Sequence, residues 1–348
     1  MTFERSCSKI TIVNQKEVIG MLRPEVIEKL FDIIDETSMM ISSERQTGYL
    51  NAMCESCQNI ITQNIRQTFD VETKEALQNQ YNELDELEFA QEEIRKALQL
   101  AILKGLKAER MTNAAMTPDS IALIVGYLAS KFIKDFKNAS IADLTVGTGN
   151  FLTAVLNHLE TQPASVYGVD NNSELLQIAY VLSDMQEHEI QFYQQSSLKP
   201  LFIDPLDAII SDLPIANLEQ DELALLDLEL ARKGCTYLPY LLIENHLNYL
   251  LPGGYGFYII PNDLFNQSYA TEFHQLLTKQ ANIQALLQLP TSLFKADELG
   301  KSLFVVQKQG EDVSPISEVL VAQLPNLNDP TKFSQMLNRI EEWIKLNK

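Results

Sequence analysis

Apolar residues recur with two different periods along this chain. Between residues 23 and 110 they recur at helical spacing with no convincing strand, as in the run Val26, Leu30, Ile33 and Ile34. From residue 113 onward, short apolar runs alternate with helical patterns. The chain is therefore predicted to contain a small all-helical domain followed by a larger α/β domain.

The second region contains eight apolar runs that we interpret as strands: Ile141–Val146, Val166–Asp170, Ile190–Tyr193, Ala208–Ser211, Gly256–Ile260, Ile283–Leu289, Leu303–Gln307 and Val319–Ala322. Helical patterns fill most of the gaps, and their alternation with the strands predicts a doubly wound, mostly parallel, Rossmann-like sheet. The runs at 283–289 and 303–307 leave little room for a crossover helix, so we expect an antiparallel edge hairpin there. Helices are predicted at 121–132, with Thr117 as N-cap and Pro118 as the first helical residue, and near 332–346.

A glycine-rich turn gives the first indication of chemistry. The strand that begins at Ile141 leads to Asp143, then to a turn containing Gly147 and Gly149, then to a helix start. Glycines let the backbone turn tightly and approach a ligand closely. The next strand ends at Asp170, whose carboxylate suits a ribose diol at the nucleotide-binding edge of an open α/β sheet. These features predict a site for an adenosine-containing cofactor.

The same turn favours one cofactor over another. A dinucleotide fingerprint needs a small residue where Leu152 stands, and Asp143 would place a negative charge near a pyrophosphate. S-adenosylmethionine has no phosphate, and its sulfonium and ammonium groups suit a carboxylate. We therefore favour S-adenosylmethionine over a nicotinamide cofactor, with a turn that binds nothing as the remaining alternative.

The run from Ile209 to Ile215 places Asp212 at the end of another strand, at the same edge of the sheet. An exocyclic amino group on a base is a poor nucleophile, because its lone pair is delocalised into the ring. Acceptors such as the Asp212 carboxylate and the Leu213 carbonyl would bind its two hydrogens and free the lone pair. The alternative is an ordinary loop that caps a strand, since Asp and Pro are common turn residues.

In their order, these motifs resemble those of adenine-specific N(6) DNA methyltransferases, in particular the modification subunits of type I restriction systems and their standalone bacterial relatives. The resemblance covers residues 113–309 and rests on Thr117-Pro118, the run 143–152, Asp170-Asn171, the run 211–215, Pro261–Phe265 and Leu289–Lys295. The helical stretch before them is similar to the helical region that precedes the catalytic domain in those relatives. The resemblance implies a class I methyltransferase fold and an S-adenosyl-L-methionine cofactor.

The resemblance also implies roles for individual residues. Those that would bind the cofactor are Thr117, Pro118, Asp143, Thr145, Gly147, Thr148, Gly149, Asn150, Phe151, Asp170, Asn171, Ser196, Ser197 and Leu198. Those of the catalytic loop would be Asp212, Leu213, Pro214 and Ile215.

Three positions depart from the family pattern. Leu213 stands where a first proline is usual, and Ser196 stands where an acid often contacts the adenine of the cofactor. Ile215 replaces an aromatic residue that would stack on a flipped base, a contact that contributes roughly 1–3 kcal/mol. Two hypotheses follow: an adenine-amino methyltransferase, or a catalytically degenerate cofactor-binding module that acts through protein partners.

The charge of the chain bears on its partners. Its 47 acidic and 27 basic residues give a net charge of −20, which disfavours a grip on DNA phosphates. We expect weak binding to nucleic acid and a protein partner or homodimer contact through the helical domain. The histidines have no metal-ligand spacing, so we assign no metal site.

The remaining features concern location and domain limits. The four cysteines do not form a disulfide framework, and Cys54 and Cys57 lie within a helical pattern, which fits a reducing cytoplasm. No apolar run is long enough to cross a bilayer, and Met1–Gly20 lacks the apolar core of a signal peptide. We expect residues 1–20 to be a tail or a start-site artefact. Residues 21–112 would form the helical domain, 113–325 the methyltransferase domain and 326–348 a C-terminal helix.

Overall fold

The structure, a computed structural model, describes residues 11–12, 22–111, 116–294, 300–326 and 329–347. Most of the expected tail at 1–20, the expected boundary at 112–113 and the motif residue Lys295 lie outside the described residues. The chain divides into two compact units, which are described separately below.

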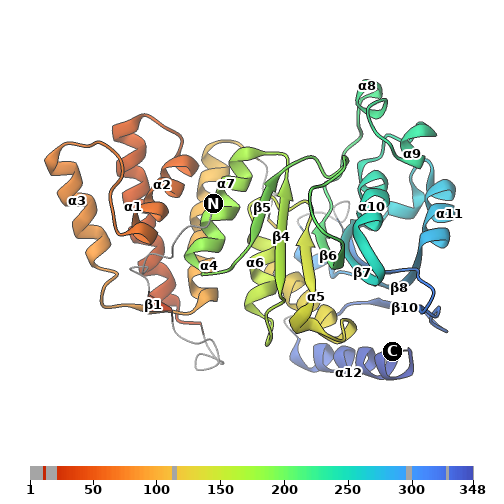
Figure 1. Cartoon of the computed structure of the whole chain (residues 1–348). Helices are drawn as coiled ribbons and strands as arrows, with labels where there is room; N and C mark the ends of the chain where they lie inside the picture. The colour runs from red at the N-terminus through yellow and green to blue at the C-terminus, as the bar shows by residue number, and fades with distance from the viewer. Residues whose placement is uncertain (1–10, 13–21, 112–115, 295–299, 327–328, 348) are drawn as a thin grey trace. The chain divides into compact units, whose positions relative to one another are not determined.

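Unit 1 comprises residues 1–117, 147–157 and 172–190. As predicted, it is mainly helical; its helices are α1 Pro24–Arg45, α2 Tyr49–Thr62, α3 Val71–Asn82, α4 Gln91–Ala108, α6 Asn150–Asn157 and α7 Ser173–Met185 (Figure 1). The prediction of no strand before residue 110 is wrong at one point, because β2 Glu88–Phe89 pairs in parallel with β1 Thr11–Ile12. The pairing joins residues far apart in sequence, which helical periodicity cannot indicate.

The core of unit 1 draws on helices from both parts of the sequence. Leu30 of α1 and Leu98 of α4 are buried in one apolar cluster with Val181 and Leu182 of α7. The compact unit is therefore larger than the segment 21–112. Cys54 and Cys57 are buried free thiols of α2, which confirms that this pair belongs to a helix.

Unit 2 contains a mixed sheet with the strand order β10-β8-β9-β7-β6-β3-β4-β5. Its strands are β3 Ser140–Asp143, β4 Ser165–Asp170, β5 Gln191–Gln194, β6 Leu206–Asp212, β7 Leu250–Pro261, β8 Ala281–Gln288, β9 Lys301–Lys308 and β10 Leu320–Gln323. β9 runs antiparallel to β7 and β8, and the other pairings are parallel. The mostly parallel sheet and the antiparallel β8–β9 pair are confirmed, and β10 extends this edge alongside β8.

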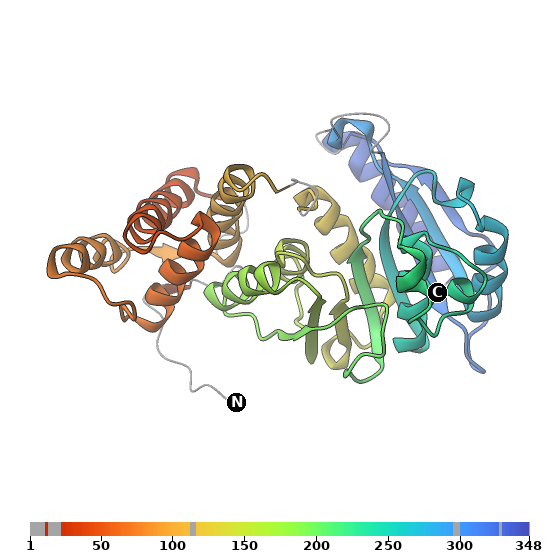
Figure 2. The ribbon, with the colours of Figure 1, turned by 90° about the horizontal axis from the view of Figure 1, so that it is seen from above.

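Helices cover both faces of this sheet. The side chains of a strand alternate between the two faces, so a strand such as β7 contacts helices on both sides. On β7, the Phe257 ring packs against Phe132 of α5 Asp119–Phe132, and Phe132 stacks on Trp343 of α12 Pro330–Asn347. Tyr258 instead belongs to the core cluster that includes residues of α10 Leu238–Tyr249 and α11 Ala270–Gln280. Figure 2 shows α5 and α10 on opposite sides of the sheet, so the fold is doubly wound. The short helices are α8 Gln220–Leu223, α9 Glu229–Arg232, η3 Phe136–Asn138, η4 Leu264–Asn266 and η5 Thr291–Leu293.

Two predicted boundaries need correction. Helix α5 begins at Asp119 with Pro118 as N-cap and no side-chain cap, so Thr117 is not the capping residue. Strand β3 ends at Asp143 rather than Val146, because the backbone leaves the ladder there and the Val146 N–H donates to the Val169 carbonyl at 3.0 Å. Ending the strand at Asp143 places its carboxylate at the edge of the sheet, where the turn begins.

The parallel register gathers three acids at this edge. Strands β6, β3 and β4 are neighbours, and they end at Asp212, Asp143 and Asp170 respectively. Because parallel strands end at the same edge of a sheet, their terminal side chains are brought to one side of unit 2. Within the described parts of the chain, no helix is long and apolar enough to span a membrane.

Candidate functional site

Asp143 is the most buried of the three strand-end acids, with 2% of its surface exposed. Its Oδ1 accepts hydrogen bonds from the Thr145 N–H at 3.0 Å and from the Ser211 hydroxyl at 2.9 Å. Burial raises the pKa of Asp143 to about 7, and the charges of Asp170 and Asp212 act in the same direction, although both hydrogen bonds oppose them. Proximity to a cation would favour the ionised form of this carboxyl group.

The backbone next to Asp143 is held from two directions. The Leu144 N–H donates to the Ser211 hydroxyl at 3.2 Å, and the Leu144 carbonyl accepts from the Ser197 hydroxyl. The Ser197 carbonyl in turn accepts from Asn245 Nδ2 at 2.8 Å. The Ser197 hydroxyl, predicted to bind cofactor, is therefore engaged in supporting the strand end.

Asp212 forms an ion pair that joins two distant segments. Its Oδ1 lies 2.6 Å from Lys301 Nζ, and the two side chains are 16% and 21% exposed. Its main-chain carbonyl accepts from the Thr145 hydroxyl at 3.2 Å, which links the loop to the turn after β3. The acid at the end of β6 is thus fixed by its side chain and by its backbone.

The rest of the predicted catalytic loop divides into a buried and an exposed part. Leu213 is 1% exposed, and its N–H donates to the Ile259 carbonyl at 3.1 Å. Proline has no N–H and could not make this bond, so the departure at Leu213 fits the local pairing of β6 with β7. Pro214 is exposed and Ile215 is 53% exposed.

The predicted ribose acid and its neighbours lie nearby in unit 2. Asp170 is half-buried, and its carbonyl accepts from the Gln195 N–H at 3.0 Å. Asn171 is exposed, while Ser196 and Leu198 are half-buried. The Ser196 hydroxyl accepts a long hydrogen bond of 3.4 Å from the Leu198 N–H.

The glycine turn belongs to unit 1 from Gly147 onward. Gly147 and Gly149 have φ angles of 52° and 76°, and a Cβ on Gly149 would lie 3.0 Å from the Cβ of Ala179. Both the conformation and the close approach therefore require glycine at position 149. Between and after the glycines, Thr148 and Asn150 are each 1% exposed.

Two polar atoms of this turn are buried and unsatisfied. Thr148 Oγ1 and Asn150 Nδ2 have no hydrogen-bond partner among the residues that the structure describes. Such groups cost roughly 1–3 kcal/mol each unless something pairs with them. Of the other predicted residues, Thr117 and Phe151 are buried in unit 1, whereas Pro118 is half-buried in unit 2.

The structure adds three residues that sequence reasoning missed. Ser211 was inside a quoted motif but had no assigned role, and it bonds to both Asp143 and Leu144. Lys301 and Asn245 carry no local signal, because their partners lie far away in sequence. Within the described ranges, no group of three or more His, Cys, Asp or Glu side chains has a metal-binding arrangement.

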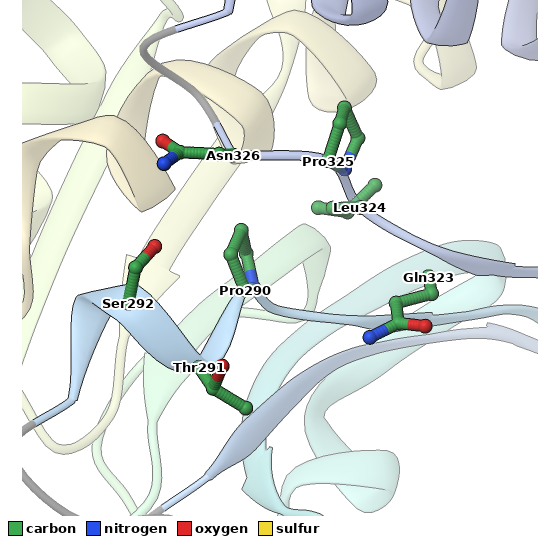
Figure 3. Close-up of a pocket in the computed structure, with 7 residues that line it drawn as sticks. All are labelled: Pro290, Thr291, Ser292, Gln323, Leu324, Pro325 and Asn326. Carbon is green, nitrogen blue, oxygen red and sulfur yellow. The ribbon is translucent and has the colours of Figure 1, made fainter.

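A separate surface pocket lies where β8 and β10 end (Figure 3). It encloses about 470 Å³, and its lining residues are Pro290, Thr291, Ser292, Gln323, Leu324, Pro325 and Asn326. None of these seven side chains is charged, and none belongs to the predicted cofactor or catalytic set. The pocket is therefore distinct from the cluster of strand-end acids.

Known proteins resemble this chain over most of its length. It is 36% identical over 330 residues to an uncharacterized protein of Bacillus subtilis (strain 168), YtxK, covering 94% of this chain and all of that one. A solved structure of a candidate class I S-adenosylmethionine-dependent methyltransferase from Listeria monocytogenes shares 35% identity, with a TM-score of 0.83, and the match covers 92% of this chain and all of that one. The Escherichia coli type I restriction enzyme EcoEI methylase subunit is 23% identical over 293 residues, covering 75% of this chain and 57% of the subunit.

Two family descriptions match successive parts of the sequence. The YtxK N-terminal helical domain matches residues 28–106, and N-6 DNA Methylase matches residues 108–342. The second match spans all eight strands of the sheet and the three strand-end acids. The chain has a class I methyltransferase fold and belongs to the N-6 DNA Methylase family.

Proposed function

We propose that the chain is an S-adenosylmethionine-dependent methyltransferase of the adenine-amino type. The observation that carries this proposal is the set of carboxylates at the ends of three adjacent parallel strands: Asp143, Asp170 and Asp212. Such a cluster suits a ligand that brings two positive charges and a ribose diol, and it would repel a pyrophosphate. We assign the chemistry to residues 113–325, between the helical domain at 21–112 and the terminal helix.

The residues present fit this cofactor. Asp143 and Asp170, both of unit 2, supply carboxylates for its cationic and ribose parts. A buried carboxyl with a pKa of about 7, close to two further carboxylates, gains from a cationic ligand. When bound, S-adenosylmethionine supplies a methyl group attached to an electron-poor sulfur.

Asp212 and the Leu213 carbonyl are positioned for the acceptor substrate. The Asp212 carboxylate would accept one hydrogen of the target amine and the Leu213 carbonyl the other, which favours a pyramidal nitrogen with an available lone pair. The same carboxylate is paired with Lys301 Nζ, which lies 2.6 Å from Asp212 Oδ1. After methyl transfer the amine releases its surplus proton to solvent.

A second candidate is a catalytically degenerate module that retains the fold and acts through protein partners. Two observations favour it: the exposed aliphatic Ile215 offers no ring for stacking, and Lys301 neutralises the acid of the loop. In this case the helical domain would form the partner or homodimer contact. The two candidates share a cofactor site and differ in whether methyl transfer occurs.

The test combines binding with turnover. Calorimetry with S-adenosylmethionine should show binding, and Asp170→Ala should weaken it by roughly ten- to a hundredfold, because a hydrogen bond to a charged group contributes about 1.5–3 kcal/mol. The exposed Asp204 provides the control, since Asp204→Ala makes the same charge change elsewhere in unit 2. Absence of binding at millimolar ligand would exclude both candidates.

A methyl-transfer assay on DNA, RNA and protein then separates the two. Transfer to an amino group supports the enzyme. Binding without transfer to any of the three substrates supports the module.

A further inference from the structure

The sheet of unit 2 ends in a strand that has one neighbour among the described residues. β10 is the last strand in the sheet order, and it pairs with β8. Along β10, Leu320 and Ala322 are half-buried, whereas Val321 is 67% exposed and Gln323 is exposed. Val321 lies on the same face as Leu286 of β8, because the two residues are register partners. β10 thus combines an edge for backbone pairing with a partly apolar face.

The residues that usually prevent such a strand from pairing with another chain are missing from β10. Edge strands of soluble proteins are commonly protected by Lys, by other charged residues or by Pro. The sequence of β10 is Leu-Val-Ala-Gln, and Val319 before it is also exposed. Valine is among the residues that favour strands. The edge is therefore suited to pair with a further strand.

The surface around this edge is uncharged, although the chain is strongly acidic. Two adjoining pockets of about 470 and 460 Å³ share Gln323, and the first of them is the pocket of Figure 3. None of the residues that line either pocket carries a charge. Two copies of a chain with a net charge of −20 repel each other. They can therefore approach most readily through a neutral surface such as this one.

We infer that β10 forms a homodimer contact, in which two copies of the chain pair their β10 strands antiparallel about a two-fold axis at Val321. A dimer with such an axis uses the same surface patch on both copies. The contact involves residues of unit 2 and continues the sheet of one copy into that of the other. It goes beyond the proposed function, since it requires neither the cofactor nor methyl transfer.

The antiparallel direction keeps the acidic side chains of the two copies apart. With the axis at Val321, this residue lies opposite the partner's Val321, and β-branched residues directly opposite each other stabilise a sheet. Glu318, the first acid before β10, lies opposite the partner's Leu324. The two Glu318 side chains are thus six positions apart along the strands, from 318 to 324, which is about 20 Å. That separation exceeds the Debye length of about 8 Å at physiological salt, so their repulsion is screened.

A contact through one short strand should be weak. Interfaces that bury less than about 1,200 Å² are typical of transient complexes, so we expect a reversible dimer with a micromolar Kd. Sedimentation equilibrium of the full chain from about 1 µM to about 1 mM covers that range. Raising the salt from about 0.05 M to about 0.5 M should lower the Kd, because salt screens the repulsion between two acidic copies. An increase in the Kd with salt would contradict an uncharged contact.

Val321→Lys tests the contact itself. It places two like charges opposite each other in the pair, so the Kd should rise about tenfold or more. Val71→Lys is the matched control, because it makes the same substitution at a valine that is 73% exposed on α3 of unit 1. This control should dimerise as the wild type does. If Val71→Lys dissociates the dimer and Val321→Lys does not, the contact belongs to the helical domain and the inference is wrong.

Mixing two variants tests the position of the axis. Val321→Lys and Val321→Glu should each be monomeric, whereas their equimolar mixture should dimerise, because the axis places the opposite charges across from each other. Circular dichroism checks that each variant is folded, and Gln323→Lys, at the other exposed position of β10, tests the contact if Val321→Lys is not. The inference is overturned if the wild type is monomeric over the whole concentration range, if the charged β10 variant dimerises like the wild type, or if the mixture stays monomeric.

Discussion

Lys301 Nζ lies 2.6 Å from Asp212 Oδ1, although the two residues are 89 positions apart. Asp212 ends β6, and Lys301 begins β9, the antiparallel strand that pairs with β7. The ion pair is partly shielded from water, so removing one partner costs more than it does in a pair on an open surface. It links the acid of the proposed catalytic loop to the start of β9.

We expect Asp212→Ala to nearly abolish methyl transfer while leaving cofactor affinity almost intact, because its hydrogen bond matters chiefly in the transition state. A loss of about 10²–10³-fold in kcat is the scale for a preorganised electrostatic contact of this kind. Single-turnover transfer and calorimetry measure the two quantities separately. Equal turnover in the wild type and in Asp212→Ala would refute the mechanism, even if the cofactor binds.

Lys301→Met should reduce turnover through the same acid. The methionine leaves a partly buried carboxylate without its cation, so we expect a destabilisation of about 1–3 kcal/mol and a misdirected Asp212 side chain. Lys301→Arg should restore most of the rate, since it keeps a charged donor. If Lys301→Met instead raises turnover, the ion pair inhibits the acid rather than positions it.

The affinity for a cationic cofactor should depend on pH through Asp143. Its pKa of about 7 means that below pH 7 the folded protein holds a proton that a cation would displace. Binding should therefore release a proton and strengthen by up to about tenfold per unit as the pH rises toward 7, then level off. Calorimetry in two buffers with different ionisation enthalpies counts that proton.

Asp143→Asn provides the control for this pH dependence. Both hydrogen bonds from Thr145 and Ser211 reach Oδ1, which an asparagine oxygen can replace. The variant should bind more weakly at pH 8 and show no proton release. A pH profile that is unchanged in Asp143→Asn would assign the titration to another group.

The stability of unit 2 should depend on pH through His246, a buried residue of α10. Burial lowers its pKa to about 3, and neither of its ring nitrogens has a partner among the described residues. The unfolded histidine titrates near 6.5, so between pH 6.5 and 3 the unfolded chain binds a proton that the folded protein does not. The free energy of unfolding therefore does not change with the titration of this histidine above pH 6.5, and it decreases as the pH falls from 6.5 toward 3. Asp143 acts in the opposite sense, because its folded pKa lies above 3.8.

His246→Leu should remove this dependence and the unpaired nitrogens together. We expect the free energy of unfolding to rise by about 1 kcal/mol at pH 7.5 and by about 3 kcal/mol more at pH 4.5. Fluorescence of Trp343 in urea reports on unit 2, since it is the single tryptophan of the chain. The exposed His274 is the matched control, and a similar gain in His274→Leu would contradict the assignment.

Ile215→Tyr should raise activity on a nucleic-acid substrate. A ring at this exposed position adds a stacking surface worth roughly 1–3 kcal/mol per base, or about five- to a hundredfold. Stability should change by less than about 0.5 kcal/mol, because the side chain is 53% exposed. Leu225→Tyr adds a ring at another exposed position, 73% exposed, and should have no effect on turnover. A decrease in Ile215→Tyr turnover would argue for a substrate other than a base.

The sequence by itself determined the elements and the strand-end acids. Apolar periodicity depends on neighbours a few residues apart, so it predicted the strands of the sheet and the helices of unit 1. Asp143 and Asp170 could be placed because each follows directly from its own strand, and the Asp143–Thr145 hydrogen bond spans two positions. The glycines could be predicted because the turn requires their backbone freedom.

Only the tertiary structure decided which distant groups meet. Lys301 reaches Asp212 because β9 pairs antiparallel with β7, the strand next to β6, a register no local pattern encodes. Arg95 reaches Asn150 because α4 and α6 belong to one compact unit, across a gap of 55 positions. Such contacts depend on how the long segments between the two residues fold. They also depend on which buried polar groups satisfy one another. Both are properties of the whole fold, and in this chain they determine how its candidate acid and amide are oriented.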